Sequence, residues 1–367
     1  MKELVGVINL DDELDQLSEL TYFRCGAAVP FAGRYRLIDF VLSNMTGAGI
    51  VDIALFVRRK YRSLMDHLGE GKSWDLDRNH GGLFILPPDW NDPTDVSLGD
   101  LQHVHNNLDF FNRSSGNSMV HSGSRHISKV DLRKVYEQHI RTGADITLVY
   151  KPVSEMRPEY ESCVRLDVNE RGFVTNIHNE QHHPNIYMEI FVMDKYKYLE
   201  LVKDCIARGK SHFFHDAIQG GLDHLKIGAY AYTGYHAVIN SVESYYASSM
   251  ELLNREKYED LFRDNPIRTK IKYEVPTKYL ENSNVTGSLV ANGCTIEGAI
   301  ENSILFRSVQ VGKGARISNS IIMQKCVIEE DAVLENVIMD KDVRLSRGVT
   351  LKGNSIKPFV IAKSSHI

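Results

Sequence analysis

Two arginines near the start of the chain, Arg34 and Arg36, follow two chain-breaking residues, Pro30 and Gly33. Apolar residues at helical spacing begin directly after them, so the stretch is typical of a loop that enters a helix. Arginine side chains and free backbone N–H groups at a helix start are groups that bind phosphates. The stretch therefore predicts contacts to a sugar phosphate, a nucleotide phosphate or a small phosphorylated effector. The alternative is a packed loop whose arginines are solvated.

The segment after the apolar run Leu4–Ile8 is a second place where phosphates are expected, because ligands of open α/β sheets bind beyond the carboxyl ends of strands. A phosphate loop needs glycines and basic side chains. Residues 9–15 instead contain no glycine and four carboxylates, those of Asp11, Asp12, Glu13 and Asp15. Two like charges ~5 Å apart repel by roughly 3 kcal/mol at an effective dielectric constant near 20. We therefore expect that ATP does not bind here in the usual way, and the alternative is a solvated acidic turn.

The arginine stretch, residues 28–44, reads AVPFAGRYRLIDFVLSN. It resembles the signature PFGGKYRLIDFPLSN of the bacterial ADP-glucose pyrophosphorylases, which are glucose-1-phosphate adenylyltransferases. The resemblance runs in register over nearly the whole chain, with further matches at residues 61–64, 74–76, 107–110 and 245–246. It implies a nucleotidyltransferase fold. In active members of that family it also implies a GGxGxRL-type phosphate loop and a magnesium ion, and residues 9–15 do not contain that loop.

Both magnesium carboxylates that the resemblance implies are missing from the sequence. Residues 119–131 resemble the family's AGDHIYKMDY, and the alignment puts Arg125, or Ser124 under a different anchor, in place of the first aspartate. Residues 233–246 resemble GYWRDVGTIESYW and put Val238 in place of the second. Magnesium binds through carboxylates and phosphate oxygens, and a guanidinium replaces neither. We therefore predict that the family's magnesium site is lost, that no metal is bound there, and that Arg125 forms a structural salt bridge. The alternative for Arg125 is a contact to a phosphate or an effector.

Two lysines of the family are also replaced. The sugar-phosphate lysine of the FxEKP motif aligns with Glu180, and the lysine two residues before AVPF aligns with Gly26. A carboxylate at the first position would repel glucose 1-phosphate. Together with Arg125 and Val238, these replacements predict that no catalytic residue remains.

Strand and helix patterns alternate over roughly the first 255 residues. This alternation predicts a doubly wound, mostly parallel α/β sheet. The strand patterns are at 4–8, 50–57, 146–153 and 186–192, and the helical patterns are at 37–45, 130–142 and 196–208.

The last third of the chain contains a repeat. Its short motif begins at Gly287, Asn302, Asn319, Asn336 and Asn354. Apolar residues also recur every six positions, which scatters them around an α-helix but places them inside a triangular coil; these are Val309, Ala315, Ile321, Val327, Val333, Met339, Leu345 and Leu351. We therefore predict a left-handed parallel β-helix of hexapeptide repeats with about 18 residues per turn.

These patterns divide the chain into a nucleotidyltransferase-like domain with a degenerate active site at 1–253, a connector at 254–283 and a β-helix domain at 284–367. The chain has a formal charge of −5, which argues against a general nucleic-acid or membrane-surface binder. Its five scattered cysteines suit a reducing compartment, and no apolar run approaches the length of a membrane span. We expect a cytoplasmic protein.

Two histidine clusters have spacings that a metal might use. One comprises His178, His182 and His183, and the other begins with His212 and His215 and continues with Asp216. The first lies in a polar loop, and the second opens an aromatic segment that resembles the family's HDFGKDII. We expect a surface loop and strand packing rather than metal sites.

The sequence is most similar to the noncatalytic, D-type subunits of bacterial glucose-1-phosphate adenylyltransferase. This resemblance implies a regulatory subunit without activity of its own, which assembles with the catalytic subunit as a heterotetramer of two plus two in glycogen synthesis. One alternative is an active sugar-1-phosphate nucleotidyltransferase with a divergent active site. The other is a hexapeptide acyltransferase, although no histidine between residues 282 and 363 offers the usual general base.

Overall fold

The computed structural model describes residues 3–11, 16–88, 99–264 and 266–367. The chain packs into two compact units, one formed by residues 1–14 and 40–236 and the other by residues 15–39 and 237–367. The boundaries at 253 and 283 stay a prediction about folding domains, whereas these units describe where the chain packs. Among the described residues, no helix has the length and apolar character needed to cross a membrane.

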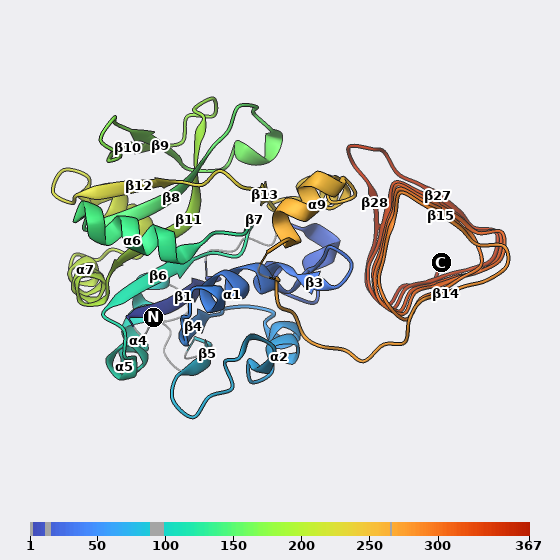
Figure 1. Cartoon of the computed structure of the whole chain (residues 1–367), viewed down its shortest axis with the longest axis horizontal. Helices are drawn as coiled ribbons and strands as arrows, with labels where there is room; N and C mark the ends of the chain where they lie inside the picture. Colours follow the sequence, from blue (N-terminus) through green and yellow to red (C-terminus); the bar gives the residue numbers. More distant parts are fainter. Residues whose placement is uncertain (1–2, 12–15, 89–98, 265) are drawn as a thin grey trace. The chain divides into compact units, whose positions relative to one another are not determined.

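Among the described residues of the first unit, nine strands form one sheet (Figure 1). Seven of them follow the order β10-β9-β11-β6-β1-β4-β5, and β8 pairs with β11 and β12. The strands β6, β1, β4 and β5 run parallel, whereas β11 is antiparallel to its neighbours. The strands are β1 (Leu4–Asn9), β4 (Asp52–Phe56), β5 (Gly82–Leu86), β6 (Ser118–Ser122), β8 (Ile146–Pro152), β9 (Arg165–Val168), β10 (Val174–His178), β11 (Asn185–Asp194) and β12 (Ile227–Ala231).

The predicted α/β architecture is confirmed. Strands lie at all four predicted places, and the predicted helices correspond to α1 (Leu37–Gly47), α6 (Leu132–Thr142) and α7 (Lys195–Ala207). The hydrophobic core includes Val5, Leu148 and Phe191 from three of the strands. The other helical segments that the structure describes are α2 (Arg62–Leu68), α4 (Gly99–Asn106), α5 (Leu108–Arg113), α8 (Val242–Glu251), α9 (Arg255–Phe262), the π-helix η5 (Phe213–Ile218) and the 3-10 segments η1 (Ser18–Thr21), η2 (Gly26–Ala28), η3 (Lys72–Trp74), η4 (Pro158–Tyr160) and η6 (Gln219–Gly221).

The second unit is built on a left-handed parallel β-helix, which Figure 1 shows end-on as a triangular coil. Its three sheets have five parallel strands each among the described residues. They are β14 (Lys278–Tyr279), β17 (Thr295–Ile296), β20 (Gln310–Val311), β23 (Val327–Ile328) and β26 (Arg344–Leu345); β15 (Asn284–Thr286), β18 (Ala299–Glu301), β21 (Arg316–Ser318), β24 (Val333–Glu335) and β27 (Thr350–Lys352); and β16 (Leu289–Val290), β19 (Ile304–Leu305), β22 (Ile321–Ile322), β25 (Val337–Met339) and β28 (Phe359–Ile361). The remaining strands of the described residues are the short β2 (Pro30–Phe31), β3 (Tyr35–Arg36), β7 (His126–Ser128) and β13 (His236–Val238).

The coils are mostly one residue shorter than the predicted length of about 18 residues per turn. Paired residues are mostly 17 positions apart, as in Arg316↔Val333↔Thr350, and 15 apart for Asn284↔Ala299. Because 17 is not a multiple of six, the six-residue series drifts by one position per turn, and a one-residue shift turns a side chain to the other face. Val309 and Ala315 accordingly lie in the core, whereas Val327 and Val333 are only half-buried and the next residues, Ile328 and Leu334, lie in the core instead.

The repeated Gly/Asn position has a structural reason. Gly287, Asn302, Asn319 and Asn336 all have positive φ angles, between 44° and 55°. Glycine and asparagine adopt this left-handed conformation more readily than other residues. The buried Ser303 and Ser320 that follow join successive coils, because each hydroxyl oxygen accepts a backbone N–H from the next coil at 3.0–3.1 Å.

Candidate functional site

Asp11 follows β1 and points into the first unit. Its Oδ2 lies 2.8 Å from His103 Nδ1 and 3.4 Å from Arg58 Nη2, and the Asp11 and His103 side chains are fully buried. The charge of this carboxylate is therefore met inside the protein, so Asp11 is not part of a solvated acidic turn. Asp12, Glu13 and Asp15 lie outside the described residues.

A second polar contact closes the end of β1. Asn9 donates from Nδ2 to Asp100 Oδ2 at 3.3 Å, and the other oxygen of Asp100 accepts the backbone N–H of Phe213 at 2.9 Å. His103 packs its ring edge-on against Phe56, with the ring centroids 4.8 Å apart. Helix α4, which carries Asp100 and His103, is thus attached by side chains to the position where a glycine-rich loop would cradle phosphates.

Arg125 forms an ion pair with Glu189. Glu189 has a positive φ of 58° at an irregularity in the pairing of β11 with β8, and its carboxylate lies against Gly123. A Cβ atom on Gly123 would come within 2.5 Å of Glu189 Oε2, so a larger residue there would displace the Glu189 carboxylate. The predicted structural salt bridge of Arg125 is confirmed.

Two buried histidines lie beside this pair. His126 Nδ1 is 2.9 Å from His236 Nε2, and His126 Nε2 is 3.8 Å from Glu189 Oε1. Burial, together with the neighbouring Arg125, lowers the pKa of His126 to about 3. Burial and the positive potential of His126, Lys151 and Arg157 also lower the pKa of His236 well below its usual value. Both rings are therefore neutral at pH 7.

The other aligned positions are apolar or exposed. Val238 lies in β13 and is 1% exposed, Gly26 opens η2, and Glu180 is exposed in the loop after β10. Arg125 and Glu180 belong to the first unit, and Gly26 and Val238 to the second. The structure therefore brings Arg125 together with Glu189, which the sequence did not indicate because the two are 64 positions apart.

Arg34 and Arg36 lie in the second unit within a group of cations. Burial is the main cause that lowers the pKa values of Arg307 and Lys272. The positive charge of Arg34 lowers the pKa of Arg307 further. The charges of Arg307 and Arg36 do the same for Lys272. Tyr35, the residue between the two arginines, stacks on Phe262 with ring centroids 5.0 Å apart. The anion-binding role of Arg34 and Arg36 stays a prediction.

Lys341 is the most deeply buried lysine of this group, with only 6% exposure. Burial and the nearby charges of Arg36 and Arg24 lower its pKa to about 6. Its ammonium group donates no hydrogen bond to any described residue, whereas Arg24 donates from Nη2 to both carboxylate oxygens of Asp340 at 2.7–2.8 Å. Lys341 thus lacks the partner that a buried ammonium requires. No sequence pattern indicates Lys341, because only the coiling of the repeat places it beside Arg36.

The cluster of His212, His215 and Asp216 has a local structural role. Asp216 Oδ2 accepts the backbone N–H groups of Ser211 and His212 at 3.1 and 2.9 Å, and His215 Nδ1 lies 3.0 Å from Gln219 Oε1. These contacts secure the start of η5. The spacing therefore reflects the capping of a helical turn.

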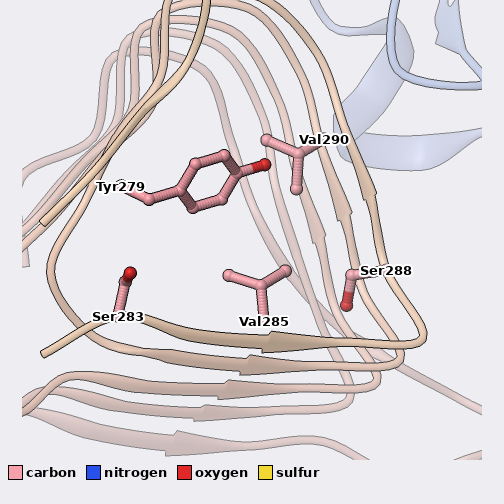
Figure 2. Close-up of a pocket in the computed structure, with 5 residues that line it drawn as sticks. All are labelled: Tyr279, Ser283, Val285, Ser288 and Val290. Atoms are coloured by element: carbon pink, nitrogen blue, oxygen red, sulfur yellow. The ribbon is translucent and has the colours of Figure 1, made fainter.

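The first coil of the β-helix surrounds a hollow of about 520 Å³ (Figure 2). Its strands β14, β15 and β16 are each the first strand of their sheet, so one edge of each is not paired with another described strand. Figure 2 shows that Val285 and Val290 point into the mouth of the coil. The residues that line the hollow are Tyr279, Ser283, Val285, Ser288 and Val290.

Comparison with known proteins gives consistent matches over most of the chain. Residues 15–211 match the model of the nucleotidyl transferase family, and residues 275–356 match the GlmU-like C-terminal hexapeptide model. Two similar proteins are called glycogen biosynthesis protein GlgD: that of Bacillus subtilis is 39% identical over 98% of this chain and 96% of its own length, and that of Geobacillus stearothermophilus is 41% identical over 99% and 97%. A glucose-1-phosphate adenylyltransferase of Clostridium perfringens is 30% identical over 89% of this chain and 85% of its own.

Proposed function

This chain belongs to the nucleotidyl transferase family, among the GlgD-type relatives of glucose-1-phosphate adenylyltransferase, and from this membership we propose that it is a catalytically silent regulatory subunit. It would assemble with the catalytic glucose-1-phosphate adenylyltransferase in the cytoplasm, as two plus two subunits, and modulate ADP-glucose synthesis for glycogen.

The ion pair between Arg125 and Glu189 is the observation that carries this proposal. In-line phosphoryl or adenylyl transfer needs a divalent ion that bridges phosphate oxygens, and its ligands are carboxylates. At the aligned position this chain has a guanidinium, and the acid nearest to it is already neutralised by that guanidinium. The buried contact between Asp11 and His103 supports the same interpretation for the phosphate loop.

Activity assays test catalytic silence directly. We expect the purified chain with ATP, glucose 1-phosphate and magnesium to turn over far below the ~10 s⁻¹ typical of enzymes. Added to the catalytic homologue from the same cell, it should co-elute as one complex and change that enzyme's rate or effector response. Turnover by the chain alone within about tenfold of ~10 s⁻¹ would contradict silence, and failure to co-elute would contradict the regulatory role.

The cation group around Lys341 supports a second part of the proposal, the binding of a small phosphorylated effector. Arg36, Arg24 and Lys272 lie near the buried Lys341, whose amino group donates no hydrogen bond to any described residue. A phosphate would supply several charge-assisted hydrogen bonds there. Regulation follows if the anion binds more tightly to one conformation of the assembly than to the other.

Titration with inorganic phosphate and with glucose 1-phosphate tests the effector site. Because the pKa of Lys341 is about 6 without ligand, anion binding at pH 7.5 should raise it and take up a proton. We expect affinity to fall as pH rises from 7 to 9, and heats of binding to depend on the buffer. Lys341→Ala should abolish the proton uptake, while the control Arg347→Ala, which removes an exposed arginine paired with Asp331, should not. Equal proton uptake in both variants would contradict this site.

A further inference from the structure

Two histidines of the first cluster, which the sequence predicts to be a surface loop, lie together with an aspartate on the first unit. Asp167 Oδ1 is 3.2 Å from His178 Nε2 and 2.9 Å from His183 Nε2. One ligand atom from each residue lies within 4.8 Å of the others. We propose that Asp167, His178 and His183 bind a zinc ion, with water completing its coordination.

The spacing of these atoms suits zinc. Zinc binds imidazole nitrogen and carboxylate oxygen at about 2.0–2.2 Å, and tetrahedral geometry places neighbouring ligand atoms roughly 3.3 Å apart. Both distances from Asp167 Oδ1 are already close to that value, so only a small approach of the two rings is required. Two nitrogen ligands and one oxygen ligand favour zinc over magnesium or calcium, which prefer oxygen.

Backbone register holds two of the three ligands on one face. Asn176 pairs with Asp167 across β9 and β10, and His178 is two positions further along β10. Alternate residues of a strand point the same way, so Asp167 and His178 share a face of this hairpin. The side chains of Asp167, His178 and His183 are 39%, 13% and 25% exposed, which leaves a path from solvent.

The loop that carries His183 is fastened to the same strands. Arg165, which is fully buried, donates to the carbonyl of Gln181 at 3.3 Å. Asn185 donates from Nδ2 to the carbonyl of Leu166 at 3.1 Å, and the N–H of His183 bonds to the carbonyl of Glu180 at 3.3 Å. The site is therefore held in place before any ion arrives, which lowers the entropy lost on binding.

The positions of the imidazole protons of His178 and His183 determine the zinc affinity that we expect. His178 Nδ1 accepts the N–H of Glu180 at 3.2 Å, and His183 Nδ1 accepts the N–H of Asn185 at 3.4 Å. Without metal, each Nε2–H therefore donates to Asp167. Zinc replaces these two protons, and each neutral ring then carries its proton on Nδ1, so the two long backbone contacts are exchanged for water. We therefore expect micromolar affinity, weaker than that of closed structural zinc sites.

Calorimetry with zinc chloride on the full-length chain, after removal of any histidine tag, tests the site. We expect one zinc per chain, and at least tenfold weaker binding in Asp167→Asn and in His183→Gln. The matched control is His182→Gln, because His182 is an exposed histidine of the same loop outside the cluster. Its affinity should stay within twofold of the parent.

The visible absorption of bound Co²⁺ and a variant of the second histidine cluster provide two further tests of the site. Co²⁺ should give visible bands of a four-coordinate site in the parent and in His182→Gln, and lose them in His183→Gln. No stoichiometric zinc binding, or zinc binding that survives in both cluster variants, would overturn the proposal. So would a loss of binding in a His212→Gln/His215→Gln variant. Circular dichroism of each variant separates loss of the site from loss of the fold.

Discussion

Arg125 and Lys341 illustrate two outcomes for a positive charge that folding removes from water. Arg125 forms an ion pair with Glu189, so its charge is neutralised within the fold. Lys341 has no such partner among the described residues, and burial lowers its pKa to about 6. A charge that is already paired has little left to offer a ligand, whereas an unpaired buried charge favours an incoming anion.

The buried histidine pair gives a prediction at the same scale. The pKa of His126 in the folded chain is about 3, below its value of about 6.5 in the unfolded chain, and that of His236 is also depressed. The unfolded chain therefore binds more protons below pH 6.5, and stability falls as pH falls through that value. The loss should be about 1.4 kcal/mol per pH unit for each histidine.

Urea unfolding at pH 7 and pH 5 measures this dependence. The parent chain should lose about twice as much free energy of unfolding per pH unit from this pair as His126→Gln, which retains a hydrogen-bonding group but does not titrate. Equal pH dependence in both proteins would show that the pair does not set acid stability. The exposed His182 provides the comparison, because His182→Gln should behave like the parent.

At the scale of elements, local pattern was sufficient for much of the fold. The strands β1, β4, β8 and β11 and the helices α6 and α7 lie where β-branched runs and helical spacing predicted them, because each forms from residues adjacent in sequence. The contact of Asp11 with His103 was not predictable, since 92 positions separate them. The six-residue pattern identified the β-helix, but a coil of 17 residues shifts its inward positions after one turn.

The corner residues of the β-helix carry a prediction about that element. Asn302 has a φ of 44°, and a left-handed conformation costs most residues about 1–2 kcal/mol. Asn302→Ala should therefore reduce the free energy of unfolding by about 1–2 kcal/mol, whereas Asn302→Gly should be close to neutral because glycine adopts positive φ freely. Thermal unfolding followed by circular dichroism measures both. A glycine variant as unstable as the alanine variant would refute the corner explanation.

At the scale of the whole molecule, exposed apolar residues indicate where a partner is expected to bind. Tyr273 is 99% exposed and Tyr279, on edge strand β14, is 54% exposed. Unpaired strand edges and exposed aromatic side chains are surfaces that proteins commonly cover with another chain. If the chain is a regulatory subunit as proposed, we expect the catalytic subunit to contact the first coil of the β-helix and the segment before it.

Introducing negative charges at this surface tests the assembly. Tyr273→Glu/Tyr279→Glu should prevent co-elution with the catalytic subunit while leaving the melting temperature of the isolated chain within a few degrees, because both side chains are exposed. The control is Ile356→Glu, which places the same charge on a residue that is 77% exposed near the last coil. If the double variant still assembles as the parent does, the first coil is not the contact surface.

The contact between position 125 and Glu189 also limits how this lineage can change. An aspartate at position 125 would set two acids face to face, because the Glu189 carboxylate that now pairs with Arg125 would have no cation beside it. The repulsion would have to be relieved at Glu189 in the same step, since either change alone leaves an unbalanced charge. A carboxylate at position 125 would thus require a second mutation at Glu189.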